Sequence, residues 1–387
     1  MQWEQFKSFA RQPMFVFLLV LTIASTTGLQ GWRTLLNNFA VEQGGLSGGD
    51  IGIVQSVREI PGFLALFAII FFRYFQEHRF GVFTVFLMGI SIAITGFFPS
   101  VMGITITTLL MSTGFHYYET VNQSLSLQYF EKSKTPLILS YHRSFAALTA
   151  IATGLLIWML TSIFALDYIV LFAVIGVIVI ALSVWAFFQN PVDHTLVPQH
   201  NKFLLKKRYW LYYTLTFLSG ARRQIFIAFA VFLLVDRFNF SIENITLLFV
   251  GNNIINFYIL PYIGKFIIRY GEQKLLTLEY FSLIFIFLAY AFSTSAIVVI
   301  ILYIFDHILF NFSFAIRTFF QKIADPRDIA PSMAMGFTIN HISAVIIPFI
   351  GGRLWEYNYQ LPFIFGALLA LASLIFVQFI NRELKSA

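Results

Sequence analysis

The sequence predicts an all-α integral membrane protein with twelve transmembrane helices arranged in two six-helix, pseudo-symmetric bundles. Long apolar stretches recur along all 387 residues, hydrophobic residues make up 58% of the chain and charged residues only 11%. A soluble domain carries about 25% charged residues, whereas about 20 apolar residues in a helix cross the roughly 30 Å hydrocarbon core of a bilayer. A third observation, the placement of lysine and arginine, gives the orientation of the helices.

Helices are the expected state of each apolar stretch, because membrane-spanning strands would be short segments of alternating polarity. The predicted spans, in order, are 14–39, 50–72, 81–98, 103–129, 136–160, 167–188, 209–235, 244–268, 274–293, 296–320, 331–354 and 361–380. No cysteine is present, so disulfides and thiolate metal sites are excluded.

Most lysines and arginines outside the spans fall in the loops on the side of the two termini, including Lys206, Lys207 and Arg208 in the central loop. The opposite loops carry only Arg237 and Arg353. This asymmetry predicts a multi-pass protein of the cytoplasmic (inner) membrane with both termini in the cytoplasm. It also explains the net charge of +7 without a nucleic-acid partner.

The sequence predicts three regions: an N-terminal six-helix bundle (1–189), a central cytoplasmic loop (190–208) and a C-terminal six-helix bundle (209–387). Short matches connect the two bundles. Arg79-Phe80-Gly81 recurs as Arg269-Tyr270-Gly271, and Gly31-x-Arg33 recurs as Gly220-x-Arg222, both at an offset of about 190 residues. Matches in the same order at nearly one offset indicate duplication of a six-helix unit.

The loop after the eighth span, from Gly264 through Arg269 and Gly271 to Lys274, resembles the cytoplasmic loop motif of the major facilitator superfamily. The first-half loop is degenerate, because Tyr74 stands where the motif begins with glycine. The resemblance covers essentially the whole chain and implies a transporter with its substrate cavity between two bundles. The glycine-rich fifth helix of many proton-driven exporters in this family is absent, which weighs against drug–proton antiport.

A gating or conformational role is predicted for seven residues: Arg58, Glu59, Arg79, Gly81, Gly264, Arg269 and Gly271. A loop arginine can bond the last carbonyls of a neighbouring helix and so latch the bundles together in one conformation. The alternative is that the loop arginines only enforce orientation. Arg58 and Glu59, next to a proline in span two, are interpreted as a local salt bridge.

Charged side chains within membrane spans are rare and mark functional sites. The resemblance implies that spans one, four, seven and ten line the central cavity, and most intramembrane charges fall on these spans or their neighbours. The predicted substrate-binding residues are Arg33, His116, Tyr117, Asn122, Arg222, Arg223, His307, Asn311, Asn340 and His341, and the predicted proton-coupling residues are Glu119 and Asp306.

Two alternatives stay open for these charges. Arg222 could form a structural ion pair with Asp306 or Glu119 in place of binding substrate, and the two acids could be structural partners of the arginines. Glu279 in span nine is expected to be an ordinary neighbour of the loop arginines. His116 and Glu119 alone would make a weak metal site, so no metal and no cofactor is predicted.

Five arginines near the expected cavity outnumber three acids there; the arginines are Arg33, Arg58, Arg143, Arg222 and Arg223, and the acids are Glu59, Glu119 and Asp306. The sequence therefore predicts a monomeric secondary transporter, not an enzyme, whose partners are membrane lipid and a small organic solute of anionic character, with protons as the candidate coupling ion. The alternative is proton-driven efflux of a cationic or amphiphilic compound. A non-transporting sensor is less favoured, since no loop or tail is long enough to relay a signal.

Overall fold

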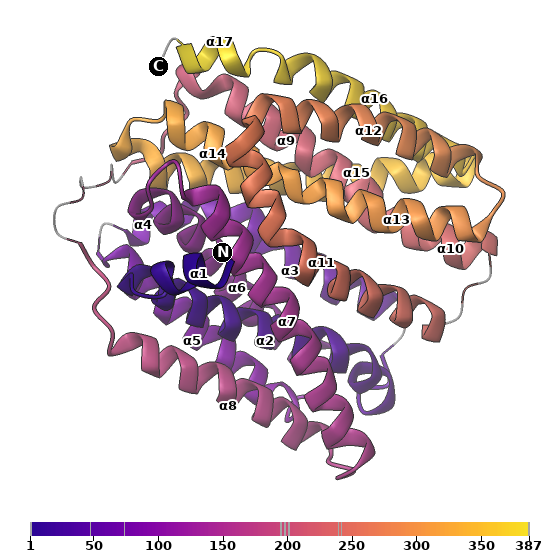
Figure 1. Ribbon diagram of the computed structural model, residues 1–387. Helices are drawn as coiled ribbons and strands as arrows, with labels where there is room; N and C mark the ends of the chain where they lie inside the picture. Colours follow the sequence, from indigo (N-terminus) through magenta and orange to yellow (C-terminus); the bar gives the residue numbers. More distant parts are fainter. Residues whose placement is uncertain are drawn as a thin grey trace. The chain divides into compact units, whose positions relative to one another are not determined.

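A computed structural model describes residues 2–385 except 47, 73, 194, 195, 197, 198, 200, 201, 239 and 241. The described chain is helical throughout its ordered elements and contains no strand in these ranges (Figure 1). Its first half contains α1 (Gln2–Phe9), α2 (Pro13–Glu42), α3 (Gly48–Phe63), η1 (Leu64–Phe67), α4 (Ala68–Phe71), α5 (Glu77–Thr95), α6 (Val101–Tyr129), α7 (Thr135–Ser162) and α8 (Tyr168–Phe187).

The second half begins with a 3₁₀ turn, and two of its long helices are interrupted by shorter helical segments. These are η2 (Lys207–Tyr209), α9 (Trp210–Ile225), η3 (Phe226–Ala230), α10 (Val231–Phe238), α11 (Ile242–Tyr270), α12 (Glu272–Phe292), α13 (Ala296–Phe310), η4 (Asn311–Ser313), α14 (Phe314–Ile323), η5 (Pro326–Asp328), α15 (Ile329–Tyr357), α16 (Gln360–Val377) and α17 (Ile380–Lys385).

Each of the twelve predicted spans coincides with a helix or an interrupted helix of the structure. By length and apolar composition alone, eight segments within the described residues could cross a membrane. The spans that fall short of this test are α3, α6, α9 and α15. The helices α3 and α9 are short, with 16 residues each, and charged or amide side chains interrupt the apolar sequence in all four.

The contacts between helices divide the chain into two compact units. Unit 1 comprises residues 1–129 and 145–203, and unit 2 comprises residues 130–144 and 204–387. The loop before α7 and the start of α7 therefore pack with the second-half helices. The domain boundaries expected from the sequence stay a prediction.

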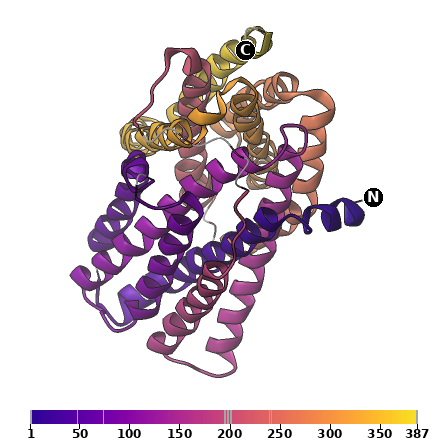
Figure 2. The ribbon, with the colours of Figure 1, turned by 90° about the vertical axis from the view of Figure 1, so that its left-hand side faces the viewer.

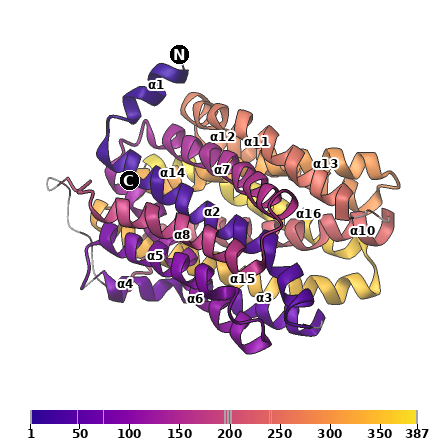
Figure 3. The ribbon, with the colours of Figure 1, turned by 90° about the horizontal axis from the view of Figure 1, so that it is seen from below.

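Unit 1 is built around α5, which packs along α6 and α8, while α2 lies beside α8 (Figures 1 and 3). Its buried core joins Trp32 and Phe39 of α2 to Met111 of α6 and Phe172 of α8. Gly176 permits the close approach of α8 to α5, because a Cβ there would lie 2.5 Å from the backbone nitrogen of Ala93. The short helix α1 extends away from the rest of unit 1 (Figure 2).

Unit 2 packs α12 against α16, and packs α9 against both α15 and α16 (Figure 1). Its core gathers aromatic side chains such as Phe287 and Tyr290 of α12 and Phe363 of α16. Two of its spans are irregular near their centres. The π-helical segment η3 interrupts the span formed by α9 and α10, and the 3₁₀ turn η4 interrupts the span formed by α13 and α14.

Candidate functional site: polar groups inside the two units

In unit 1, α6 carries the polar stripe that the sequence predicts. His116 is buried and Glu119 and Asn122 are half-buried. His116 and Glu119 lie three residues apart and so share a helix face. Buried polar atoms normally have a hydrogen-bond partner, yet the Oδ1 atom of Asn122 has none among the described residues. The stripe therefore offers an acceptor that a ligand or a water molecule could use.

Tyr117, the other predicted ligand on α6, has a different setting. Its ring lies 6.1 Å from that of Phe71 and 6.0 Å from that of Phe80, measured between centroids, and its hydroxyl donates to the carbonyl oxygen of Leu64 at 3.4 Å. Tyr117 thus packs against α4, α5 and η1 within unit 1. Its predicted contact with a substrate stays a prediction.

The charged residues of α2 and α3 differ in exposure. Arg33 is exposed on α2. Arg58 forms the predicted local salt bridge, with 2.5 Å between its NH2 nitrogen and Oε1 of Glu59. Its guanidinium carbon also lies 5.7 Å from the ring centroid of Trp32, and Ser112 of α6 donates to its backbone carbonyl. Arg58 is therefore held at the α3–α6 contact, one turn before Pro61.

In unit 2, Arg222 of α9 is 3% exposed and is enclosed by α12 and α16. Its NH2 nitrogen lies 3.5 Å from Oε1 of Glu279, its guanidinium carbon lies 4.1 Å from the ring centroid of Tyr280, and its NH1 nitrogen donates to Ser373. This geometry favours the ion-pair interpretation of Arg222. The pairing partner is Glu279, whereas the sequence suggested Asp306 or Glu119.

Glu279 is the residue for which the expectation from sequence was wrong. It is fully buried in α12 and pairs with Arg222, so it is not a neighbour of loop arginines. A signal was present in the sequence: a lone carboxylate two turns into an otherwise apolar span is costly unless it has a partner in the membrane. The resemblance implied a cavity lined by spans one, four, seven and ten, and span nine is not among them.

Asp306 of α13 is 3% exposed and its Oδ2 atom has no hydrogen-bond partner among the described residues. It interacts electrostatically with both Arg222 and Glu279. Next to it, His307 packs its ring 4.8 Å from those of Phe226 and Tyr303. Three helices of unit 2 thus bring two carboxylates and one guanidinium together.

One turn further on, Asn311 of η4 donates to Oδ1 of Asn256 at 3.0 Å and to the backbone carbonyl of His307 at 2.8 Å. The Nδ1 atom of His307 is buried without a hydrogen-bond partner in the described chain. Arg223 places its guanidinium carbon 5.0 Å from the ring centroid of Phe310. These contacts connect α9, α11 and α13 around one polar region of unit 2.

The predicted ligands on α15 bond to nearby backbone. Asn340 donates to the carbonyl oxygen of Thr216 at 3.3 Å, which ties α15 to α9. His341 has its Nδ1 atom 2.9 Å from the carbonyl oxygen of Phe337 on its own helix, and its ring stacks on that of Phe337 at 4.5 Å. Both side chains are half-buried. A substrate-binding role for them stays a prediction.

The two predicted loop motifs have different contacts. Arg79 donates to the backbone carbonyl of Phe187, at the C-terminal end of α8, and lies over the Phe187 ring. This is the predicted contact between arginine and a helix end, but both partners belong to unit 1. Arg269 is exposed and lies 5.3 Å from the ring centroid of the adjacent Tyr270. This exposed setting is what we would expect if Arg269 only helped to orient the helices in the membrane.

The motif glycines each have a geometric reason. A Cβ on Gly264 would lie 2.7 Å from Cα of Leu137 and 2.7 Å from the carbonyl oxygen of Pro136, so α11 and the start of α7 touch backbone to backbone. A Cβ on Gly81 would lie 2.9 Å from Val121. Gly271 has a φ of 82°, a left-handed conformation that favours glycine, immediately before α12.

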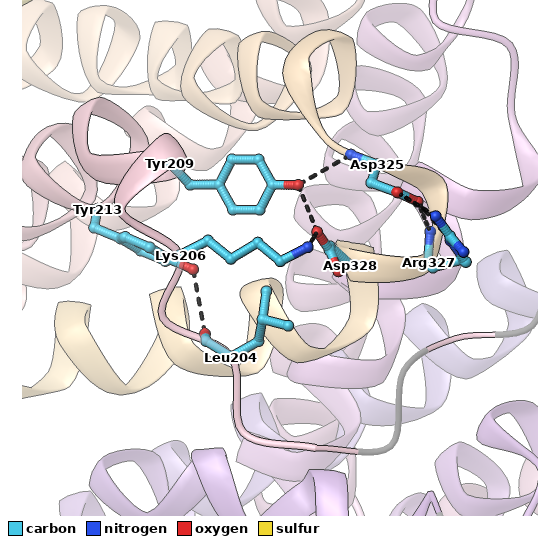
Figure 4. A network of polar contacts seen from close by, with 7 residues as sticks. All are labelled: Leu204, Lys206, Tyr209, Tyr213, Asp325, Arg327 and Asp328. Carbon is cyan, nitrogen blue, oxygen red and sulfur yellow. Dashed lines mark hydrogen bonds and ion pairs between the residues drawn. The ribbon is translucent and has the colours of Figure 1, made fainter.

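A polar network fixes the entry into α9 within unit 2 (Figure 4). Asp328 is fully buried and accepts from Nζ of Lys206 at 2.5 Å and from the hydroxyl of Tyr209 at 2.6 Å. On the rim, Arg327 bonds Asp325 at 2.8 Å. The hydrogen bonds from Arg327 hold the pKa of the Asp325 carboxyl well below its usual range. The sequence did not predict this network, because charged residues in a loop are normally solvated.

The helices and the buried charges together define a class: a helical membrane protein whose polar residues are held inside its bundles. Residues 8–330 match the family model of the Major Facilitator Superfamily, and the chain belongs to that family. Among curated proteins, none matches the sequence.

Solved transporter structures share the fold. A variant of the E. coli fucose:proton symporter FucP superposes with a TM-score of 0.76 at 14% identity, covering 95% of this chain and 98% of that one. A bacterial homologue of the iron transporter ferroportin gives 0.76 at 13%, covering 97% and 100%. The human organic anion transporter MFSD10 gives 0.70 at 11%, covering 95% and 99%. At these identities the likeness establishes the fold alone.

Proposed function

We propose that this protein is a secondary active transporter that moves a small organic solute across the membrane by alternating access. Membership of a transporter family supports the transport class. The observation that carries the proposal of an organic solute is the set of buried polar atoms without a protein partner in the described chain, notably Oδ1 of Asn122 and Nδ1 of His307. Such atoms are normally satisfied, so an arriving hydrogen-bonding ligand would stabilise them.

We favour an anionic solute, because arginines outnumber acids among the intramembrane residues. Glu279 adds one acid to the intramembrane residues, so the excess of arginines over acids is smaller. Because Arg222 pairs with Glu279, we propose that Arg222 holds this acid in place of binding the anion. Arg33 and Arg223 are then the arginines that we propose to bind the anion. The proposed uncharged contacts are His116, Tyr117, Asn122, His307, Asn311, Asn340 and His341.

Glu119 and Asp306 are the proposed proton-coupling residues. A carboxylate in a membrane span changes charge when it binds a proton, and this can be linked thermodynamically to the binding of substrate. For gating, we propose Arg79 with Gly81, Gly264 with Arg269 and Gly271, and the Arg58–Glu59 pair. In this proposal the protein is a monomer of the inner membrane with both termini in the cytoplasm, and it uses no cofactor.

Ligand-dependent stability of the purified protein would identify the solute. A compound that binds the folded state raises the melting temperature in proportion to the logarithm of its concentration above Kd. A panel of carboxylates, phosphate esters and neutral sugars should give the largest shifts for the anions. Uptake of the best anion into proteoliposomes then tests Arg223→Gln, with Arg237→Gln as the control outside the predicted cavity.

We expect Arg223→Gln to lower the affinity at least tenfold, since a charge-assisted hydrogen bond contributes about 1.5–3 kcal/mol, and Arg237→Gln to leave it unchanged. Stabilisation by cations only, or unchanged anion affinity in both Arg223→Gln and Arg33→Gln, would contradict the anion proposal.

The second candidate is proton-driven efflux of a cationic or amphiphilic compound. The Arg222–Glu279 pair favours it, because an arginine that holds an acid in place is what this alternative requires. Glu119 would then contact the solute. Cells carrying the protein should tolerate higher concentrations of cationic compounds, and Glu119→Gln should remove that tolerance.

A further inference from the structure

We propose that Glu279 and Asp306 form a proton-binding site inside unit 2 that retains one proton near neutral pH, with Arg222 as its counter-ion. The proposal deepens the proposed transport function by assigning to Glu279 a proton site that it shares with Asp306. Only its link to transport rests on that function. The site itself can be tested without a substrate.

The three side chains are among the most enclosed polar groups of unit 2. Glu279 is 0% exposed, and Arg222 and Asp306 are each 3% exposed. They come from α12, α9 and α13. The only ion pair of the cluster within the described residues joins Arg222 and Glu279 at 3.5 Å, longer than a charge-assisted hydrogen bond. Both carboxyl oxygens of Glu279 and one of Asp306 have no hydrogen-bond partner in the described chain.

The charges of this cluster do not balance when both acids are ionised. Two carboxylates interact with one guanidinium. A buried carboxylate without a cation is strongly disfavoured in a membrane interior, and two carboxylates that share one site cannot both ionise readily. A single bound proton makes the cluster neutral, because one carboxylate then pairs with Arg222 and the other is a neutral carboxyl group.

The other groups around the cluster do not supply the missing charge. His307, which follows Asp306 on α13, is packed against the rings of Phe226 and Tyr303, and such an enclosed imidazole is favoured in its neutral form. Tyr280 and Tyr290 on α12 and Tyr303 on α13 are buried phenols, which are neutral near pH 7. Ser373 on α16 accepts a hydrogen bond from Arg222 and donates one to the backbone carbonyl oxygen of Leu369. On α9 the next cation, Arg223, lies over Phe310. The single proton is therefore shared by Glu279 and Asp306.

The cluster of Arg222, Glu279 and Asp306 lies close to two irregular helical segments. Arg222 lies one turn before the π-helical segment η3, and Asp306 lies just over one turn before the 3₁₀ turn η4. Single-turn π segments inside α-helices recur at functional sites. Loss of the proton would leave an excess negative charge between two helices that already depart from regular geometry there. Proton release is therefore expected to shift α9 and α13 relative to α12.

Infrared spectroscopy of the purified full-length protein tests the proposal with the proton itself as the ligand. A protonated carboxyl group has a carbonyl stretch that is well separated from the bands of a carboxylate. We expect the wild-type protein to show such a band near neutral pH and to lose it in alkaline buffer. Selective ¹³C labelling of the glutamate or aspartate carboxyls should shift the band and so show whether a glutamate or an aspartate carries the proton.

Two neutral variants make the test specific. In Glu279→Gln the remaining Asp306 can pair with Arg222 and ionise, and in Asp306→Asn the same holds for Glu279, so each variant should lose the band. Glu272→Gln is the control, because Glu272 is also buried at 2% exposure but has Lys322 at 2.6 Å as its own cation. It should leave the band unchanged.

The absence of a protonated-carboxyl band from the wild type near neutral pH overturns the proposal, and so does a band that persists in both variants. Should one variant fail to fold, the band of the other variant decides the question. If the proton site is confirmed but no transport can be measured, the proposed function is wrong and the proton site remains valid.

Discussion

The two repeats of this protein place the same arginine in opposite environments. Gly31-x-Arg33 and Gly220-x-Arg222 correspond, yet Arg33 is exposed and Arg222 is buried. At an offset of 190, Ser373 beside Arg222 corresponds to the buried Ser183, whereas Glu279 corresponds to Gly89. The repeat thus preserves the arginine and the serine, and only unit 2 has the carboxylate. A buried arginine here depends on an acid in the neighbouring helix.

Replacement of the two arginines by methionine gives the largest expected contrast. Arg222→Met leaves two acids in unit 2 without their cation, and removal of one partner from a buried ion pair costs about 3–5 kcal/mol. Arg33→Met changes an exposed side chain and should stay within about 0.5 kcal/mol. Thermal unfolding of both variants in detergent measures the difference. Equal melting temperatures would show that the buried pair does not stabilise unit 2.

The sequence predicted the spans well, because crossing a bilayer demands about 20 apolar residues whatever the tertiary contacts are. It also predicted the chemical type of the Arg79 contact and the local pair between Arg58 and Glu59. It did not predict the partner of Arg222. Partner choice depends on which faces of α9 and α12 meet, and the apolar sequence of α12 has no amphipathic pattern that would reveal this.

The corresponding loops give the second contrast. Gly264 touches the backbone of residues 136–137 within unit 2, whereas Tyr74, at the equivalent position of unit 1, is 78% exposed. Gly264→Tyr should therefore force α11 away from α7 and destabilise the protein by about 1–3 kcal/mol or more. Tyr74→Gly should be tolerated. Differential scanning fluorimetry compares the two.

A control within the same helix separates close packing from helix propensity. A Cβ on Gly251 of α11 would meet no atom within 4 Å among the described residues. Gly251→Tyr should accordingly leave the melting temperature nearly unchanged. An equal loss of stability in Gly251→Tyr and Gly264→Tyr would mean that the α7 contact is not the cause.

The arginines of the two motif loops give a smaller effect. Arg79 bonds the last carbonyl of α8, and Arg269 is exposed beside Tyr270. Arg79→Gln should cost about 0.5–1.5 kcal/mol, the usual contribution of one hydrogen bond, and Arg269→Gln should cost less. Chemical denaturation of both variants measures the costs. A larger loss in Arg269→Gln would reverse the comparison and assign the stabilising loop to unit 2.

The smallest effect is expected outside the bundles, where the Arg327–Asp325 pair is open to water. Because Arg327 lowers the pKa of Asp325 in the folded protein, the pair stabilises the fold above the unfolded-state pKa of about 3.9, and this contribution is lost as the pH falls through the lower folded-state pKa. Solvent and salt screen such a pair. Asp325→Asn should thus lower the melting temperature slightly at neutral pH in dilute buffer and not at all in concentrated salt. A loss of stability comparable to that of Arg222→Met would show that the exposed Arg327–Asp325 pair stabilises the protein as much as the buried Arg222–Glu279 pair does, so that burial of the pair makes no difference.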